Sequence, residues 1–174
     1  YVYSRPEWTA LVTRNDTGIA HVADLKGRSI AVTRGTDPHI FLVRALADAG
    51  LSEKDVKLVL LQHADGKLAL QRGDVDAWAG LDPIMASAEV ENGDVLFYRK
   101  PENNSWGVLN VREAFANEHP EIVSRVIAAY EVARKKAIAE PGVLKAALVT
   151  ATKLPDNVIA KQLERTDLSH SRIG

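Results

Sequence analysis

Short runs of β-branched and apolar residues alternate with helical runs through the first two-thirds of this chain, and this alternation restricts its fold more than any other feature. Gly, Pro and Asp mark the turns between the runs, and the connections are short. Strands that alternate with helices in this way form a layered α/β domain, in which right-handed crossovers join parallel strands. The predicted strands cover residues 9–13, 29–33, 56–61, 75–79 and 95–98, with shorter helices at 65–71 and 83–91.

A helix over residues 38–49 is the clearest local prediction. Asp37 is suited to its N-cap, Pro38 to its first turn and Gly50 to the position just past its end. Its apolar residues recur at helical spacing: Ile40, Phe41, Val43, Leu46 and Ala47.

The composition changes at residues 101–105, and after one more strand at 106–111 the chain is helical. A short helix is expected at 113–117, a long one from about 119, and two more begin at Pro141 and Pro155. We therefore predict the end of one lobe with an outward hinge crossing at 1–19, a complete α/β lobe at 20–102, and a return crossing with helices of the first lobe at 103–174. The strands 9–13 and 106–110 are the candidate crossing segments.

Charge and cysteine content exclude several classes of function. The 174-residue chain has 22 Lys and Arg against 23 Asp and Glu, interspersed, so no basic patch indicates a nucleic-acid partner. No apolar run approaches the ~20 residues of a membrane helix, so we do not expect the chain to be membrane-embedded. Cysteine is absent, which excludes disulfides, thiolate metal sites and a cysteine nucleophile.

No catalytic or metal-binding motif is found. The five histidines lack the His-Glu-x-x-His spacing, and neither a Gly-x-Ser-x-Gly elbow nor a Gly-x-x-x-x-Gly-Lys loop is present. We therefore expect no catalytic residue, no metal site and no cofactor.

Several short segments occur in a distinctive order. They are Asp24-Leu25-Lys26-Gly27-Arg28, Arg34-Gly35-Thr36, Gln71-Arg72-Gly73-Asp74-Val75-Asp76-Ala77-Trp78, Leu81-Asp82-Pro83, Asn110-Val111-Arg112-Glu113-Ala114-Phe115-Ala116 and His119-Pro120-Glu121. Together they resemble the substrate-binding proteins of ABC importers for aliphatic sulfonates, taurine and nitrate, and most closely the aliphatic-sulfonate branch.

The resemblance covers nearly the whole chain and implies a fold similar to the type II periplasmic binding proteins. One α/β lobe would be complete, and the chain would add the helical part of a second lobe whose N-terminal half is lacking. It also implies an extracytoplasmic, periplasmic solute-binding component of an ABC importer in sulfur metabolism. The partners would be a small anion, an alkanesulfonate ahead of taurine or nitrate, and a membrane permease. The first six residues do not form a signal peptide, so we expect that the sequence begins after processing or is part of a longer one.

The turn before the predicted helix is the main candidate binding site. A helix start leaves unpaired N–H groups and a partial positive charge, which suits a small anion. Gly35 lets the backbone approach a ligand or adopt a positive φ, Thr36 offers a hydroxyl, and Arg34 or His39 adds positive charge. A capped helix without a ligand is the alternative. We expect the Asp37 carboxylate to cap the helix, because otherwise it would repel an anion.

Two further residues are predicted to line the same cleft. Trp78, expected to end a strand, could pack on an alkyl chain, although core packing is an equal alternative. Asp82 could accept from an amine or cap the helix that starts at Pro83. Lower-ranked cleft candidates are Arg14, Asn15, His63, Asp65, Asn103, Asn104 and Trp106.

Two other functions use related folds. The effector domain of a LysR-type regulator would follow a DNA-binding helix-turn-helix, and none is visible in this sequence. A pyrimidine-precursor synthase-like enzyme would rely on cysteine- and histidine-rich iron chemistry, and the chain has no cysteine. A non-enzymatic binding protein is the leading prediction.

Overall fold

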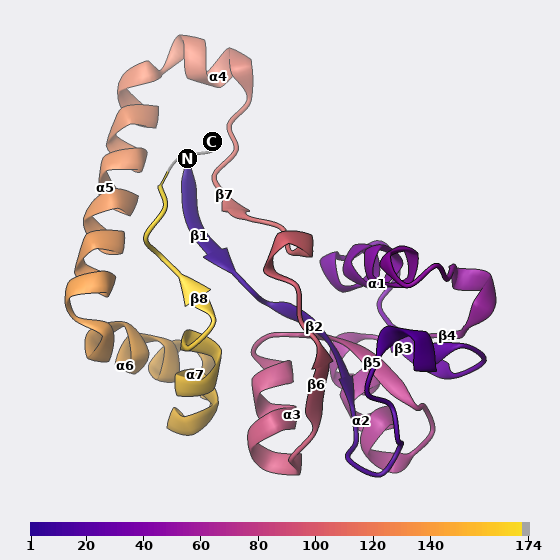
Figure 1. Cartoon of the computed structure of the whole chain (residues 1–174). Helices are drawn as coiled ribbons and strands as arrows, with labels where there is room; N and C mark the ends of the chain where they lie inside the picture. Colours follow the sequence, from indigo (N-terminus) through magenta and orange to yellow (C-terminus); the bar gives the residue numbers. More distant parts are fainter. Residues whose placement is uncertain (172–174) are drawn as a thin grey trace.

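The computed structural model describes residues 1–171 and contains two units joined by extended segments (Figure 1). The larger unit is built on a five-stranded sheet with the order β4-β3-β5-β2-β6. Its strands are β2 (Thr9–Thr13), β3 (Ser29–Val32), β4 (Lys57–Leu60), β5 (Ala77–Leu81) and β6 (Val95–Tyr98). Strand β3 pairs in parallel with β4 and β5, whereas β2 is antiparallel to β5 and β6. This confirms the predicted layered α/β fold.

Helices cover both faces of this sheet. Helix α1 (Asp37–Asp48) packs through Phe41 and Leu46 on the face that carries Leu11, while α2 (His63–Arg72) and α3 (Ile84–Asn92) cover the face that carries Val12. Adjacent residues of β2 thus point into two different cores, as the alternation of side chains along a strand requires. Short 3-10 turns occur at η1 (Val22–Leu25), η2 (Glu53–Asp55) and η3 (Pro101–Asn103).

The smaller unit consists of a narrow ribbon and four helices. Its strands β1 (Val2–Pro6), β7 (Gly107–Val108) and β8 (Thr166–Asp167) have the order β7-β1-β8. The helices are α4 (Glu113–Glu118), α5 (Pro120–Ala139), α6 (Pro141–Thr152) and α7 (Asp156–Leu163), and α5 stands beside β1 (Figure 1). Helix α7 packs on α3 and buries Val158 and Ile159. No helix within residues 1–171 combines the length and apolarity needed to span a membrane.

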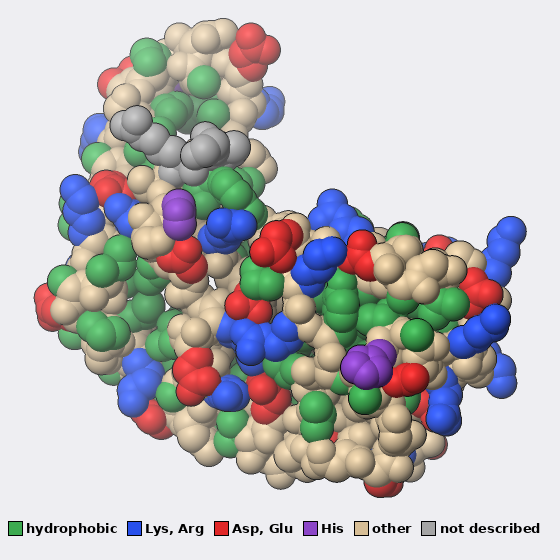
Figure 2. Space-filling model, in the orientation of Figure 1, with side chains coloured by type: hydrophobic (Ala, Val, Ile, Leu, Met, Phe, Trp, Pro, Cys, Tyr) green, Lys and Arg blue, Asp and Glu red, His purple; other side chains and the backbone are tan. Residues whose placement is uncertain are grey.

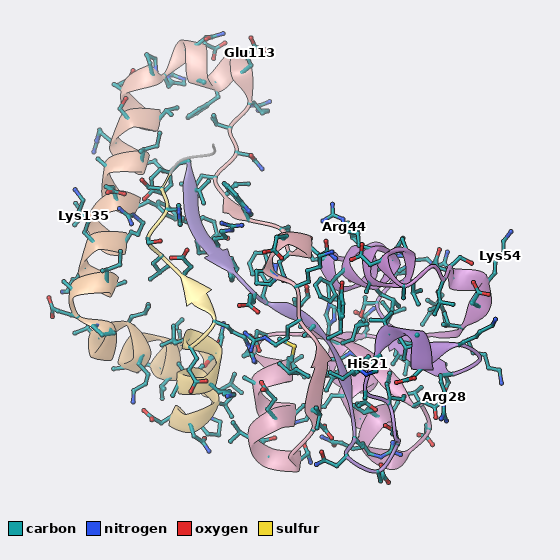
Figure 3. The ribbon with its side chains drawn as sticks, in the orientation of Figure 1. His21, Arg28, Arg44, Lys54, Glu113 and Lys135 are labelled. Atoms are coloured by element: carbon teal, nitrogen blue, oxygen red, sulfur yellow. The ribbon has the colours of Figure 1, made fainter. Side chains whose placement is uncertain are left out.

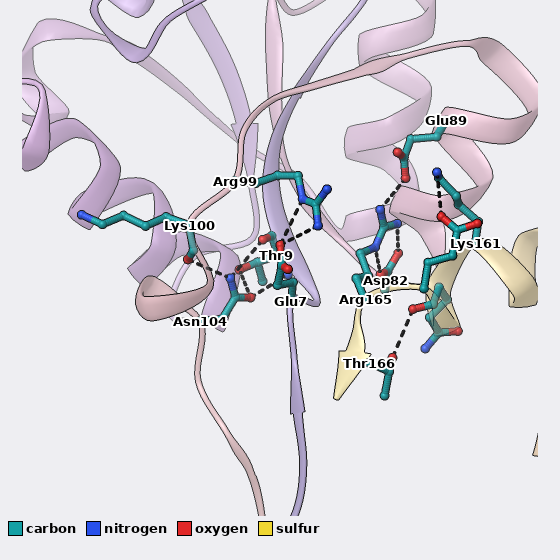
Figure 4. Close-up of polar contacts among 12 residues, drawn as sticks. Glu7, Thr9, Asp82, Glu89, Arg99, Lys100, Asn104, Lys161, Arg165 and Thr166 are labelled. Atoms are coloured by element: carbon teal, nitrogen blue, oxygen red, sulfur yellow. Dashed lines mark hydrogen bonds and ion pairs between the residues drawn. The ribbon is translucent and has the colours of Figure 1, made fainter. Parts of the chain in front are cut away.

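The chain passes between the units twice, and Asn104 fastens the two crossings together. Its buried side-chain Oδ1 accepts from the backbone N–H and the hydroxyl of Thr9, at 2.9 and 2.8 Å (Figure 4). Helix α1 also contacts the return crossing, because Arg44 donates to the carbonyl of Asn103 at 3.0 Å (Figure 3). The hinge-like connection is therefore anchored on the side of the α/β unit.

Some sequence-based boundaries differ from the structure. Strands β2 and β6 occupy the predicted residues, but β5 runs to Leu81 instead of ending near Ala79. The predicted boundary at residue 19 assigns β2 to the outward crossing, whereas the sheet includes β2 between β5 and β6. The ribbon strands β1 and β8 were not predicted, because their pairing with each other joins residues about 160 positions apart.

Candidate functional site

The order of the strands defines where the α/β unit can bind a ligand. From β3 the chain passes through α1 to β4 on one side, and then through α2 to β5 on the other side of β3. In open α/β sheets, ligands bind outside the carboxyl ends of the strands where the connections diverge in this way. This edge is formed by the segments that follow β3, β4 and β5, at residues 33–36, 61–63 and 82–83.

Helix α1 presents free amide groups at this edge. Its N-cap is Thr36, and the first backbone bond of the helix runs from the N–H of Ile40 to the Thr36 carbonyl. Because Pro38 has no N–H, the groups that the helix itself leaves unpaired are the N–H groups of Thr36, Asp37 and His39. Gly35 has φ +76°, and a Cβ placed on it would meet no atom within 4 Å, so its positive φ is what this turn requires.

The hydroxyls at this edge connect neighbouring loops. Thr36 Oγ1 donates to the carbonyl of Thr33 at 2.6 Å, and Thr33 Oγ1 donates to the carbonyl of Leu61 at 2.7 Å. Arg34 is exposed, and its guanidinium forms no ion pair or hydrogen bond with any described residue. Of the predicted residues at the turn, Arg34 is the one whose side chain is free for an anion.

The side chain of His39 connects the turn to η2. The N–H of Gly35 donates to its Nδ1 at 3.1 Å, so Nδ1 carries no proton, and Nε2 must donate to Glu53 at 2.8 Å. His39 therefore links Gly35 to Glu53 and holds the turn in place.

Asp37 does not cap α1 through its side chain, and this prediction was wrong. Thr36 has the extended backbone of an N-cap, whereas Asp37 is the first helical residue and is exposed. The cap lies one residue earlier because the Thr36 carbonyl accepts the first helical N–H. The Asp37 charge stabilises the helix start but also opposes an anion bound there.

His63 is the first residue of α2 and lies against the turn. Its Nδ1 is 3.3 Å from Thr33 Oγ1, whose single proton goes to Leu61, so the imidazole is the donor in this contact. Burial lowers the pKa of His63 from its ordinary value of 6.5. A neutral imidazole with Nε2 as acceptor therefore lies at the candidate site. From the sequence, His63 was only a lower-ranked cleft candidate, because it follows a predicted strand.

Trp78 belongs to the core of the α/β unit. It is the second residue of β5 and is 1% exposed, with α2 directly above it. A Cβ on Gly66 of α2 would lie 2.7 Å from the indole, which shows how closely the helix approaches. The expectation that Trp78 ends a strand is wrong, and the core alternative describes its surroundings.

Asp82 follows β5 at the same edge, and its carboxylate is fully engaged. Oδ1 accepts from the N–H of Ala86 in the first turn of α3 at 2.9 Å, but the N-cap of this helix is Pro83 and not the predicted Asp82. Arg165 donates to both carboxylate oxygens at 2.6 and 2.8 Å and to Glu89 at 2.6 Å (Figure 4). The side chains of Asp82 and Arg165 are 2% and 4% exposed. Arg165 was not identified from the sequence, because the two residues are 83 positions apart.

The described residues offer no ready metal site. Within residues 1–171, no group of three or more His, Asp or Glu side chains is placed to hold a metal ion. What the edge offers is therefore a set of hydrogen-bonding groups: the free amides of α1, the guanidinium of Arg34 and the imidazole of His63. Such groups bind polar ligands, and the amides and Arg34 favour oxyanions.

Comparison with known proteins identifies the family and the relatives of this chain. Residues 3–143 match the family described as NMT1/THI5 like. An Escherichia coli protein named for aliphatic sulfonate binding is 30% identical over 92% of this chain. The taurine-binding periplasmic protein of Escherichia coli is 33% identical over 72% of the chain.

A solved structure shows the same fold. The periplasmic aliphatic sulphonate-binding protein SsuA of Escherichia coli superimposes over 94% of this chain with a TM-score of 0.88 and 28% identity. This match confirms the predicted fold class, with one complete α/β lobe and the helical part of a second. The chain spans 57% of that structure, and 50% and 40% of the two sequence relatives. It therefore covers about half the length of the proteins that it resembles.

Proposed function

Since the chain belongs to the NMT1/THI5-like family, we propose that it forms one wall of the ligand cleft of an extracytoplasmic solute-binding protein. The ligand is a small organosulfonate-like anion, an alkanesulfonate ahead of taurine or nitrate. The sulfonate group would accept hydrogen bonds from the free amides at the start of α1 and from Arg34. Gly35 and Thr36 shape the turn, and His39 positions it.

The observation that carries this proposal is the place of the α1 start at the diverging edge of the sheet. In this fold class, the crevice forms where the connections between strands diverge. Here the N-terminus of α1 and the guanidinium of Arg34 lie at that point. Similarity to a sulfonate-binding protein over 92% of the chain favours the same class of ligand.

The proposal includes a cycle of closure and release. Two lobes close over the ligand through the crossings at Thr9 and Asn104, and the closed form delivers the anion to a membrane permease of an ABC importer. The protein acts outside the cytoplasm and catalyses no reaction. No observation favours the LysR-type effector or the synthase-like enzyme over this function.

Ligand binding to this chain can be tested by NMR titration, which also detects weak binding. Amide resonances of Thr36, Asp37 and His39 should shift in a saturable manner when ethanesulfonate is titrated into the chain. Arg34→Gln should weaken binding about tenfold, since a hydrogen bond to a charged group contributes roughly 1.5 kcal/mol. Asp37→Asn should strengthen it by roughly two- to fivefold, because it removes a like charge worth about 0.3–1 kcal/mol near the anion.

Arg72→Gln is the matched control, because Arg72 is an exposed arginine in the last turn of α2. It should leave the affinity unchanged. Taurine, nitrate and sulfate in parallel titrations rank the anions. The proposal fails if none of these anions shifts the amides of Thr36, Asp37 and His39, or if an organic cation does so instead.

A further inference from the structure

One buried carboxylate of the α/β unit has no partner. On the visible face of the molecule, Lys and Arg are interspersed with Asp and Glu at the surface (Figure 2). Asp94, between α3 and β6, is instead buried, with 8% of its surface exposed. Its Oδ2 is closed off from solvent and accepts no hydrogen bond within residues 1–171. A buried ionised carboxylate is unfavourable unless a hydrogen-bond donor or a cation compensates its charge.

Asp94 follows α3 in the same way as Asp74 follows α2. A glycine with positive φ ends each helix, Gly73 at +79° and Gly93 at +69°. The N–H of the aspartate then bonds back to a carbonyl of the helix, at 2.9 Å for Asp74 and 3.2 Å for Asp94. Residues at this position often make an apolar contact with the helix. Asp74 is exposed, however, so this backbone turn by itself does not bury the carboxylate of Asp94.

Asp94 lines a hollow at the end of the α/β unit opposite the candidate site. At this end β2 finishes at Thr13, beside the first residues of β5 and β6. The hollow has a volume of about 270 Å³, which is room for several water molecules. Its other lining residues are all polar: Arg14, Asn15, Asp16, Gln71 and Asn92. An occupant would therefore meet charged and hydrogen-bonding groups, and not the mostly apolar walls that organic ligands usually require.

Three side-chain oxygens at the hollow lack a donor within residues 1–171. Asn15 Nδ2 donates to the carbonyl of Gly93 at 2.7 Å, and Gln71 Nε2 donates to Asn92 Oδ1. These bonds orient both amides and leave Asn15 Oδ1 and Gln71 Oε1 unpaired. The Asp94 oxygen that is not closed off, Oδ1, is also unpaired. The hollow can thus offer one carboxylate and two amide oxygens to a cation.

The charges around Asp94 do not balance its own. Burial raises the pKa of Asp94 more than the nearby charges of Lys67 and Arg14 lower it. Each of these cations has its own carboxylate: Lys67 pairs with Glu91 at 2.8 Å, and Arg14 with Asp16 at 3.0 Å. Since the C-terminal ends of α2 and α3 add partial negative charge here, one positive charge would balance the site, whereas Arg14 opposes a doubly charged ion.

We propose that this hollow binds a hydrated monovalent metal cation, Na⁺ or K⁺, through Asp94 and the amide oxygens of Asn15 and Gln71. Carboxylates, side-chain amides and water supply the oxygen ligands that hard cations take. The bound ion would connect the loop after β2 to the ends of α2 and α3, and so stabilise the α/β unit. The site lies apart from the candidate ligand site, and the inference does not depend on the nature of that ligand.

The test compares NaCl and KCl with choline chloride at constant ionic strength, using the whole chain. Choline carries one positive charge but has no N–H and takes no oxygen ligands. A cation that binds only the folded chain raises its melting temperature in a saturable manner. We expect this rise with Na⁺ or K⁺, followed by near-ultraviolet circular dichroism of the buried Trp78. The amide resonances of Asn15, Gly93 and Asp94 should shift over the same range of concentration.

Asp94→Asn should have two opposite effects. In choline chloride it should raise the melting temperature above that of the parent chain, because it removes an uncompensated buried charge. It should also abolish both the further rise and the resonance shifts caused by Na⁺ or K⁺. Asp74→Asn is the matched control, since Asp74 has the same backbone position after α2 but is exposed. This variant should respond to Na⁺ and K⁺ as the parent chain does.

Two kinds of result would overturn the proposal. In the first, Na⁺ and K⁺ act no differently from choline on the parent chain, or act equally on the parent and on Asp94→Asn. In the second, the hollow selects another cation: Ca²⁺ saturates it at lower concentration than Na⁺, or methylammonium is the only cation that shifts the resonances.

Discussion

Single residues at the candidate site are mostly engaged in holding its shape. Thr33 and Thr36 connect the loops that follow β3 and β4, and His39 fixes the Gly35 amide while it donates to Glu53. What remains for a ligand is Arg34 and the amides of α1. A turn fixed by such bonds is preorganised, so a ligand loses less free energy to ordering when it binds.

His63 should titrate below its ordinary pKa of 6.5, because burial disfavours the charged imidazolium. When the pH falls below 6.5, the unfolded chain binds a proton at this residue before the folded chain does. The contribution of His63 to stability is therefore fully present above pH 6.5 and is lost as the pH falls toward the folded pKa. Histidine NMR titration measures the folded pKa, and urea unfolding at pH 7.5 and 5.5 measures the stability.

His63→Gln is the control, since glutamine is neutral throughout this range. The variant should lose less stability than the parent chain between these two pH values. A folded pKa at or above 6.5, or equal pH dependence of the two proteins, would contradict this account of His63.

At the scale of elements, the absence of a side chain at Gly66 lets α2 pack closely on Trp78 of β5. Gly66 lies in α2, where alanine normally stabilises a helix by up to about 1 kcal/mol. A Cβ at this position would lie 2.7 Å from the indole of Trp78, so the helix or the ring must move. We expect Gly66→Ala to destabilise the α/β unit by about 1–3 kcal/mol, the usual cost of overpacking. Urea unfolding followed by tryptophan fluorescence measures the change.

Gly142 provides the matched comparison within another helix. A Cβ there would meet no atom within 4 Å, so Gly142→Ala in α6 should be neutral or slightly stabilising. If both substitutions stabilise the chain, the contact between α2 and Trp78 is looser than the structure shows.

At the scale of the whole molecule, a buried ion cluster joins the two units. Arg165, just after α7, pairs with Asp82 and Glu89 of the α/β unit, and α7 packs on α3 beside it. Removing one member of a buried ion pair leaves an uncompensated charge and costs about 3–5 kcal/mol. We expect Arg165→Met to destabilise the chain by this amount, measured by urea unfolding.

The triple variant Arg165→Met, Asp82→Asn, Glu89→Gln should recover most of the lost stability. It leaves no buried charge, and the amide oxygen introduced at position 82 can still accept from the N–H of Ala86. If the single and triple variants unfold alike, the loss comes from packing of the Arg165 side chain and not from the stranded carboxylates.

Local signals in the sequence determined the α/β alternation, strands β2 and β6 and the extent of α1. These features could be predicted because strand propensity, helix periodicity, proline, glycine and capping residues act within a few positions. The same signals placed the candidate site at Arg34, Gly35 and Thr36. The N-cap was misplaced by one residue, since Thr36 and Asp37 are both suitable capping residues.

Only the tertiary structure decided which residues meet across the chain. It put β2 between β5 and β6, buried Trp78 under Gly66, paired Arg165 with Asp82 and joined the crossings through Thr9 and Asn104. It also left Val126 and Tyr130 of α5 half-exposed. These outcomes depend on contacts between residues far apart in sequence, or on contacts that the described residues do not make. Periodicity gives a helix an apolar face, but it does not say what covers that face.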